Sequence, residues 1–192
     1  MEHRIFENIL AASPEKKLVE RYLQISEQTE LSAKSTRLVE QINGDFNEKI
    51  ASIFELISVL KNRGFKKELF RKRTAEQIIN DGFITGCTDA ALVYLALARK
   101  VGLASKYVET IDKKWLQGGG DEISGHVYVQ TYSNKKQEWT WIDPMNRKSD
   151  DVSLEKDERV IYKEGLDSWD IGITDFESLK SAFNKIRTDF VG

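Results

Sequence analysis

The segment from Ala90 to Ala98 constrains the fold most strongly, because nearly every one of its residues is apolar. A helix of this composition has no polar face to expose, so other elements must surround it. With 192 residues, of which 40% are hydrophobic, the chain can build that surrounding core within one domain. The sequence therefore predicts a central buried helix, and the flanking segments have to cover it.

Helical periodicity dominates the chain before this central helix, and alternation of apolar and polar residues dominates after it. Helices are expected from Ser13 and Pro14 onward, at about 35–42, at about 45–60 and, after a capping box at 74–77, up to Gly82. Strands are expected at 105–110, 126–132 and 138–142, and a capping box of Thr174 and Glu177 should open a last helix. This order predicts an α+β fold, in which residues 1–62 form a helical N-terminal extension packed on a core of residues 63–192 as one compact unit.

Composition excludes several classes of protein. A single cysteine cannot form an internal disulfide or a multi-thiolate zinc site, so we expect neither a metal nor a cofactor. No apolar run approaches the roughly 20 residues that cross a bilayer, and charges interrupt the first seven residues before a secretory signal could form. These features predict a soluble, cytoplasmic protein with no membrane partner. Seven basic residues lie at 61–73, but without a known motif they do not favour nucleic-acid binding.

Cys87, the only cysteine, follows Gly86 where the central helix should begin. Unpaired backbone N–H groups and the positive end of the helix dipole stabilise a thiolate there, and a thiolate is a good nucleophile toward a carbonyl carbon. A lone intracellular cysteine is nevertheless more often a small buried hydrophobe. The position of Cys87 alone leaves both interpretations open. Other residues that could act together with a thiolate have to decide between them.

His126 and Asp143 lie at the two ends of the predicted hairpin. If Asn134 and Lys135 are the central turn residues, successive cross-strand pairs end with His126 directly opposite Asp143. A carboxylate in that position can accept the imidazole N–H, fix the ring tautomer and stabilise an imidazolium. The same alternation predicts one aromatic and polar face on the hairpin and one aliphatic face, which should pack on the helices.

Three motifs, in this order, resemble those of the transglutaminase-like superfamily. The segment from Thr85 to Val108 has the Gly-x-Cys opening, the alanine- and leucine-rich helix ending in Arg-x-x-Gly, and the strand of the cysteine motif. Gly125-His-Val-Tyr-Val and Trp141-Ile-Asp-Pro144 are similar to the histidine and aspartate motifs. The resemblance covers about residues 74–148 and implies a papain-like core, although Ala104 and Lys106 stand where the family often has Pro and Arg.

This resemblance implies that Cys87 is the nucleophile, His126 the general base and acid, and Asp143 the residue that orients His126. It assigns no side chain to the oxyanion hole, and no Trp precedes Cys87 in the chain. Gln77 and Asn80 are candidate side-chain donors, and the backbone N–H of Cys87 itself is a further candidate.

The substrate is expected to be a peptide or another amide, and its identity is not encoded in any motif. Trp115, Trp141 and Trp169 are candidates to line a substrate cleft. The glycines at 118–120 are candidates for a mobile flap over it.

Three classes of function fit these residues. The favoured class is acyl transfer through a Cys87 thioester, with hydrolysis by a cysteine peptidase or amidase preferred over amine transfer by a protein-glutamine transglutaminase. The second is a non-catalytic binding module on the same scaffold. The third, zinc-dependent hydrolysis, is disfavoured because Cys87 and His126 are more simply a nucleophile and its base.

Overall fold

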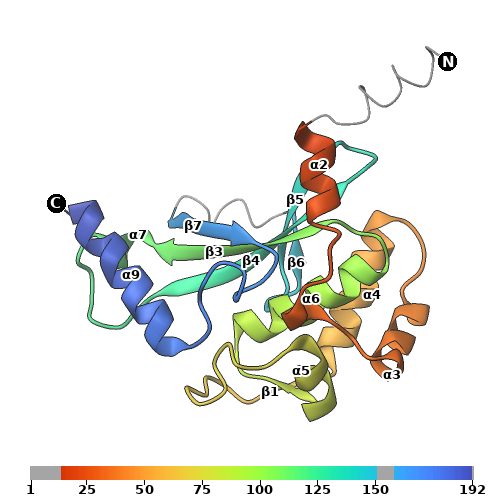
Figure 1. Cartoon of the computed structure of the whole chain (residues 1–192), viewed down its shortest axis with the longest axis horizontal. Coiled ribbons are helices and arrows are strands. Elements are labelled where there is room, and N and C mark those ends of the chain that lie inside the picture. Colours follow the sequence, from red (N-terminus) through yellow and green to blue (C-terminus); the bar gives the residue numbers. More distant parts are fainter. Residues whose placement is uncertain (1–13, 151–157, 192) are drawn as a thin grey trace.

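The computed structural model describes residues 14–150 and 158–191, so Ser13 of the expected first helix lies outside the described residues. A five-stranded antiparallel sheet runs through the molecule, with a group of helices against one of its faces (Figure 1). The strand order is β6–β5–β4–β3–β7, with bounds β3 Ser105–Asp112, β4 Gly125–Ser133, β5 Glu138–Asp143, β6 Lys148–Ser149 and β7 Arg159–Gly165. Helices packed on an antiparallel sheet confirm the predicted α+β class. The edge strand β7 was not predicted.

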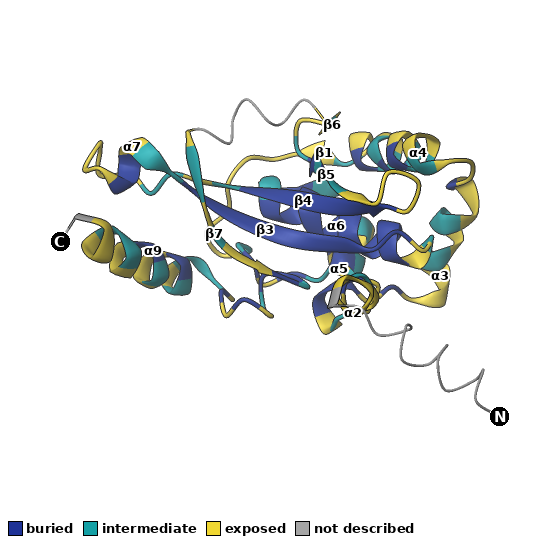
Figure 2. Ribbon diagram, turned by 90° about the horizontal axis from the view of Figure 1, so that it is seen from above, coloured by how far each residue is buried: buried dark blue, intermediate teal, exposed yellow. Residues whose placement is uncertain are grey.

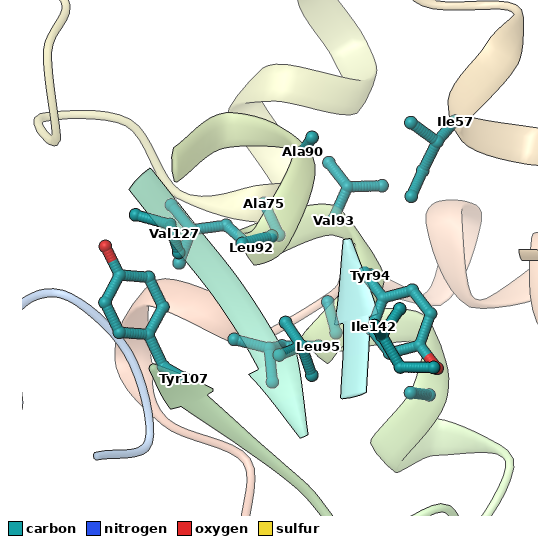
Figure 3. Packing of buried hydrophobic residues seen from close by; sticks show 14 of the residues in the cluster. Ile57, Ala75, Ala90, Leu92, Val93, Tyr94, Leu95, Tyr107, Val127 and Ile142 are labelled. Atoms are coloured by element: carbon teal, nitrogen blue, oxygen red, sulfur yellow. The ribbon is translucent and has the colours of Figure 1, made fainter. Parts of the chain in front are cut away.

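Helix α6, Cys87–Lys100, is the predicted central helix, and every residue from Thr88 to Arg99 is buried. Figure 3 shows Leu92 and Leu95 of α6 packed with Val127 of β4 and other core side chains. The aliphatic face of the hairpin thus packs on the helices, as predicted. Helices α4 and α5 contact α6 from the side away from the sheet, which completes its cover.

The helices before α6 follow their capping signals closely. They are α2 Pro14–Arg21, a 3-10 turn Glu27–Thr29, α3 Ala33–Thr36, a 3-10 helix Arg37–Gln41, α4 Phe46–Ser58 and α5 Ala75–Asp81. The single helix expected at 35–42 is therefore divided between α3 and a 3-10 helix. The predicted capping box opens α5, and Gly82 ends it in the left-handed conformation with φ +69°. Ile50, Ile53 and Ile57 of α4 belong to the same apolar core as α6.

The second face of the sheet is covered at one end by α2. Tyr22, at the end of α2, forms a small apolar cluster with Tyr132 and Trp139 of the β4–β5 hairpin. Figure 2 shows β3 and β4 buried across the middle of the molecule, whereas α2 and α9 carry many exposed residues. Among residues 14–150 and 158–191, no helix combines the length and apolar character required to cross a bilayer.

The last helix, α9 Phe176–Val191, lies at the far end of the sheet beside α7 Lys113–Leu116 (Figure 1). Its predicted capping box of Thr174 and Glu177 is wrong. Asp175 accepts a hydrogen bond from the N–H of Ser178 at 2.8 Å, and the Ser178 hydroxyl accepts from the N–H of Asp175 at 3.0 Å. Glu177 is instead free to form an ion pair with Lys67, at 2.7 Å, in the loop between β1 Lys61–Asn62 and α5.

Candidate active site

Cys87 is the first residue of α6, and Gly86 is the N-cap residue before it. The side chain of Asp89, in the first turn of the helix, points back to the preceding loop. Its Oδ2 accepts hydrogen bonds from the backbone N–H and the hydroxyl of Thr85, both at 2.7 Å, and from the Arg73 guanidinium at 2.5 Å. Because these donors fix the loop to the helix, Cys87 is held at the positive end of the α6 dipole.

Two arginines of the basic stretch 61–73 are buried beside this loop. Arg71 forms an ion pair with Glu109 at 2.7 Å, and Arg73 forms one with Asp89 at 2.5 Å. Burial opposes the charge of Arg71, but the Glu109 carboxylate outweighs it and raises the pKa of Arg71. The basic stretch therefore does not present all its charges on one exposed surface.

His126 is positioned by the neighbouring strand β3 and by helix α9. The hydroxyl of Thr110 donates to the His126 carbonyl at 2.8 Å, and the ring of Tyr128 stands edge-on to the His126 ring at 4.6 Å between centroids. Gly125 precedes it at a close approach: a Cβ there would lie 2.8 Å from Phe183 Cε2 and 2.8 Å from the Thr110 carbonyl oxygen. Glycine is required because any side chain would displace α9 or β3.

The predicted hairpin register is wrong by two residues, since Ile142 pairs with Val129 rather than with Val127. His126 and Asp143 are therefore not directly opposed. A shift of two residues keeps every side chain on its predicted face, because the faces alternate with period 2. His126 and Asp143 consequently still meet, with 3.0 Å between Nε2 and Oδ2.

Asp143 ends β5, and its side chain is almost completely buried. Its Oδ1 accepts from the backbone N–H groups of Met145 and Asn146, both at 3.1 Å, and its Oδ2 accepts from Asn146 Nδ2 at 2.8 Å. Burial opposes ionisation, but the hydrogen bonds from His126 and Asn146 and the charge of His126 outweigh it. The pKa of Asp143 is accordingly held below its ordinary value, and the residue is a carboxylate at neutral pH.

The His126 ring contacts Cys87 as well as Asp143. Because Nε2 faces Asp143, the other ring nitrogen, Nδ1, is left for the hydrogen bond with Cys87. Burial alone would lower the pKa of His126, but the hydrogen bonds with Asp143 and Cys87 outweigh burial and raise it to about 10. The structure thus brings Cys87, His126 and Asp143 into one connected row, in which the imidazole is protonated at neutral pH.

A cavity of about 670 Å³ opens in front of Cys87 and His126. This size is typical of sites that hold a small molecule or a short stretch of peptide. The loops before and after α5, the start of α6, strands β3 and β4, the segment at 121–123 and helix α9 all contribute to its walls. Its lining residues are Phe65, Phe70, Arg71, Thr85, Gly86, Cys87, Thr88, Asp89, Glu109, Asp121, Glu122, Ile123, Gly125, His126, Val127, Phe176, Leu179, Lys180 and Phe183.

The two predicted oxyanion donors, Gln77 and Asn80, are not among these lining residues. The Gln77 side chain accepts from the N–H of Thr74 in the cap of α5, and Asn80 donates to Glu76 one turn earlier. Both amides thus have partners on their own helix. In the described part of the chain, no group of three or more His, Cys, Asp or Glu side chains is arranged to hold a metal ion.

The three predicted cleft tryptophans also lie away from the cavity. Trp115 is buried in the core, and Trp141 is packed against the other face of the sheet. Trp169 donates from Nε1 to the carbonyl of Arg71 at 2.6 Å, so it supports the loop behind the cavity wall. The glycines at 118–120 are not lining residues, although the segment that follows them is.

Sequence reasoning missed the aromatic lining of the cavity, which consists of Phe65, Phe70, Phe176 and Phe183. Phe176 and Phe183 lie on the last helix, but no local pattern indicates what they would face. Phe65 and Phe70 interrupt the basic stretch at 61–73. Two aromatic residues among so many charges were the one sequence feature that could have indicated an aromatic lining.

A sequence model of the transglutaminase-like superfamily matches residues 32–144, more than half of the chain. The chain belongs to the transglutaminase-like superfamily. The match confirms the resemblance inferred from the three motifs and extends it upstream to include α3 and α4. Among curated proteins, no relative matches the sequence.

A solved structure has the same fold as this superfamily member. It is that of a "putative cysteine protease" from Cytophaga hutchinsonii, with a TM-score of 0.62 and 15% sequence identity over 86% of the present chain. The chain spans about half the length of that structure, since 52% of it is covered. At this identity the likeness establishes a shared fold, and membership of the superfamily supports a general cysteine-dependent hydrolase or acyltransferase kind.

Proposed function

We propose that the protein transfers the acyl group of a peptide or another amide through a thioester on Cys87, and that water is the normal acceptor. The observation that carries this proposal is the position of His126, whose ring contacts both Cys87 and the buried carboxylate of Asp143 beside a cavity. A nucleophile, its base and an orienting group in hydrogen-bonding contact are the arrangement that nucleophilic catalysis requires.

The reaction follows from the protonation state of His126. With the proton on the imidazole, the Cys87 sulfur attacks the carbonyl carbon as a thiolate, and the carbonyl electron pair moves to oxygen. The backbone N–H of Cys87, the first residue of α6, donates to that oxyanion in this proposal. Collapse of the tetrahedral intermediate breaks the C–N bond, and His126 gives its proton to the leaving amine. The product is an acyl-thioester and a neutral imidazole.

Neutral His126 then serves as the base for the second half of the reaction. It removes a proton from water as the water oxygen attacks the thioester carbonyl, and the C–S bond breaks to release a carboxylic acid and the thiolate. Throughout both steps Asp143 stabilises the imidazolium and keeps Nε2–H directed away from the sulfur. Water needs no binding groove of its own, which favours hydrolysis over transfer to an amine.

The test is a rapid-mixing measurement of amine release from chromogenic peptide amides. The wild-type protein should show a burst of one amine per active site, and Cys87→Ala should show neither burst nor turnover. Equal turnover by Cys87→Ala would overturn the proposal. Amine incorporation that exceeds hydrolysis at modest amine concentration would identify a transglutaminase instead.

A non-catalytic scaffold is distinguished by the reactivity of the thiol. If His126 holds a proton beside Cys87, iodoacetamide should alkylate Cys87 rapidly below pH 7, and His126→Ala should slow the reaction. Phe190→Ala, an exposed substitution on α9 outside the cavity lining, is the control. Slow alkylation of the wild-type protein below pH 7, unchanged in His126→Ala, would indicate an inert thiol.

A further inference from the structure

Three phenylalanines from two distant parts of the chain form a cluster at the cavity. Phe65 and Phe70 belong to the loop between β1 and α5, and Phe176 is the first residue of α9. Their ring centroids are 5.5 Å apart for Phe65–Phe70, 5.5 Å for Phe65–Phe176 and 5.8 Å for Phe70–Phe176. We call this set the aromatic wall.

The aromatic wall continues into the apolar side chains deeper in the same cavity. Leu179 and Phe183 extend it along α9, and Val127 extends it along β4 to the residue next to His126. Apolar side chains therefore line the cavity from the exposed Phe65 to Val127, the residue next to His126. A substrate whose carbonyl lies at Cys87 can place an adjacent side chain against these residues.

Phe65 is exposed in a way that its own packing does not explain. Its relative exposure is 56%, although it contacts two aromatic partners. Burying an apolar ring is favourable, so an exposed ring in the same cavity as Cys87 is a surface that a ligand can cover.

Two contacts connect the loop and α9 at the wall. Lys67, two residues after Phe65, forms an ion pair at 2.7 Å with Glu177, the residue after Phe176. Lys67 Nζ also lies 5.2 Å from the centroid of the Phe176 ring. The two segments of the wall are thus joined by an ion pair as well as by the contacts among their rings.

The charges inside the cavity do not favour a charged side chain at this wall. Among the residues that the structure describes, three buried ionic groups line the cavity, and each has a partner: Arg71 and Glu109 pair with each other at 2.7 Å, and Asp89 pairs with Arg73. Asp121, Glu122 and Lys180 also line the cavity, but all three are exposed to water. A charged group of the substrate would lose hydration at the phenylalanines, where Lys67 and Glu177 already pair with each other.

We propose that the aromatic wall is the specificity site of the enzyme, and that it binds a bulky apolar side chain, aromatic or aliphatic, one or two residues from the carbonyl attacked by Cys87. This inference rests on the proposed function for its account of turnover. The binding preference itself does not, because a ligand can occupy the wall whether or not the thiol is catalytic.

The first test measures binding without turnover. N-acetyl-phenylalaninamide and N-acetyl-leucinamide should slow alkylation of Cys87 by iodoacetamide at concentrations about tenfold lower than N-acetyl-alaninamide or N-acetyl-lysinamide requires. Equal protection by all four amides would overturn the assignment of the wall. Protection by the lysine amide alone would show that the exposed acidic residues, and not the wall, select the ligand.

The second test measures turnover of coumarin amides of acetyl-Phe-Gly, acetyl-Gly-Phe and their alanine counterparts. At one of the two positions, phenylalanine should raise kcat/KM about tenfold or more over alanine. Phe65→Ala should remove most of this preference. Phe190→Ala is the matched control, since Phe190 is 51% exposed on α9 and does not line the cavity.

The outcomes separate the two proposals. Turnover of phenylalanine and alanine substrates at equal rates would refute the specificity site and leave acyl transfer intact. Selective protection by the apolar amides with no turnover of any amide would refute acyl transfer and support the wall as a binding site. A preference that survives Phe65→Ala and Phe176→Ala alike would place the specificity elsewhere in the cavity.

Discussion

The two sides of the candidate active site are held in place by different means. On the helix side, the loop before Cys87 is fixed by Asp89 and Arg73, a buried pair whose members are 16 residues apart. On the sheet side, Asp143 is fixed by Asn146 and by the backbone of the turn that directly follows β5. The first support depends on tertiary packing, whereas the second is local in sequence.

This difference has consequences for how each side responds to change. A buried ion pair stabilises little in total, but the loss of one partner leaves an uncompensated charge inside the protein. A turn with several donors to one carboxylate loses only a fraction of its support when one donor is removed. Substitutions on the helix side should therefore mainly lower the free energy of unfolding. Substitutions on the sheet side should mainly lower kcat/KM.

The largest effect is expected from Asp143, where Asp143→Ala should lower kcat/KM by about three orders of magnitude because His126 loses its orienting carboxylate. Steady-state kinetics on a peptide amide measure this loss. Asp143→Asn keeps an oxygen for the turn N–H groups but removes the charge, so it separates turn geometry from electrostatics. Full activity in Asp143→Asn would show that the charge has no role.

On the helix side, Asp89→Leu should destabilise the fold by about 3 kcal/mol, because Arg73 stays buried with only the half-exposed Asp81 as its partner. Urea unfolding measures the change. The double variant Arg73→Met/Asp89→Leu removes both charges and should regain much of the stability. If the double variant is less stable than Asp89→Leu, the pair is not the source of the cost.

Changes of pH should act mainly through His126. Its folded pKa of about 10 lies above its ordinary value of 6.5, so its contribution to stability is complete below pH 6.5 and is lost as pH rises through about 10. Turnover should decline over the same alkaline range, because the leaving amine needs the imidazolium proton. The difference in unfolding free energy between wild type and His126→Gln, followed from pH 6 to 11, should shrink accordingly.

Asp143 gives the opposite dependence at acid pH. Its folded pKa is lowered, so its contribution is present above the ordinary value of 3.8 and is lost as pH falls through the folded value. The wild-type protein should therefore lose stability below pH 3.8 more steeply than Asp143→Asn does in acid denaturation. Parallel curves for the two proteins would contradict the assignment.

The smallest effect is expected from Asn146→Ala, which removes one hydrogen bond to Asp143 Oδ2 and leaves both backbone donors in place. Stability should fall by about 1 kcal/mol and kcat/KM by less than tenfold. Thermal unfolding and steady-state kinetics measure both quantities. A loss as large as that of Asp143→Ala would mean that the sheet side is as dependent on single contacts as the helix side.

The sequence predicts those features of the site that depend on the periodicity of a helix or a strand. The helix that begins at Cys87 and the shared face of His126 and Asp143 both follow from local patterns. The exact register does not, because the turn occupies residues 134–137 and ends with Gln137 in the left-handed conformation at φ +56°. The error is an even number of residues, so it changes the partners of each residue and preserves its face.

A single sequence does not predict contacts between segments that lie far apart in the chain. Trp169 was a candidate to line the cleft, yet its indole N–H donates to the carbonyl of Arg71 at 2.6 Å. The aromatic wall depends on how α9 meets the loop at 63–73, and neither segment encodes the other. The hydrogen bond of Gln77 in the cap of α5 likewise became visible only in the structure.

The position of α9 also affects the order in which the site is completed during synthesis. Cys87 leaves the ribosome 96 residues before Phe183, which at about 5–20 residues per second corresponds to roughly 5–20 s. Helix α6, β4 and β5 can form during that interval, but the α9 part of the cavity cannot. A nascent chain therefore carries Cys87 and His126 before the lining of the cavity beside them is complete.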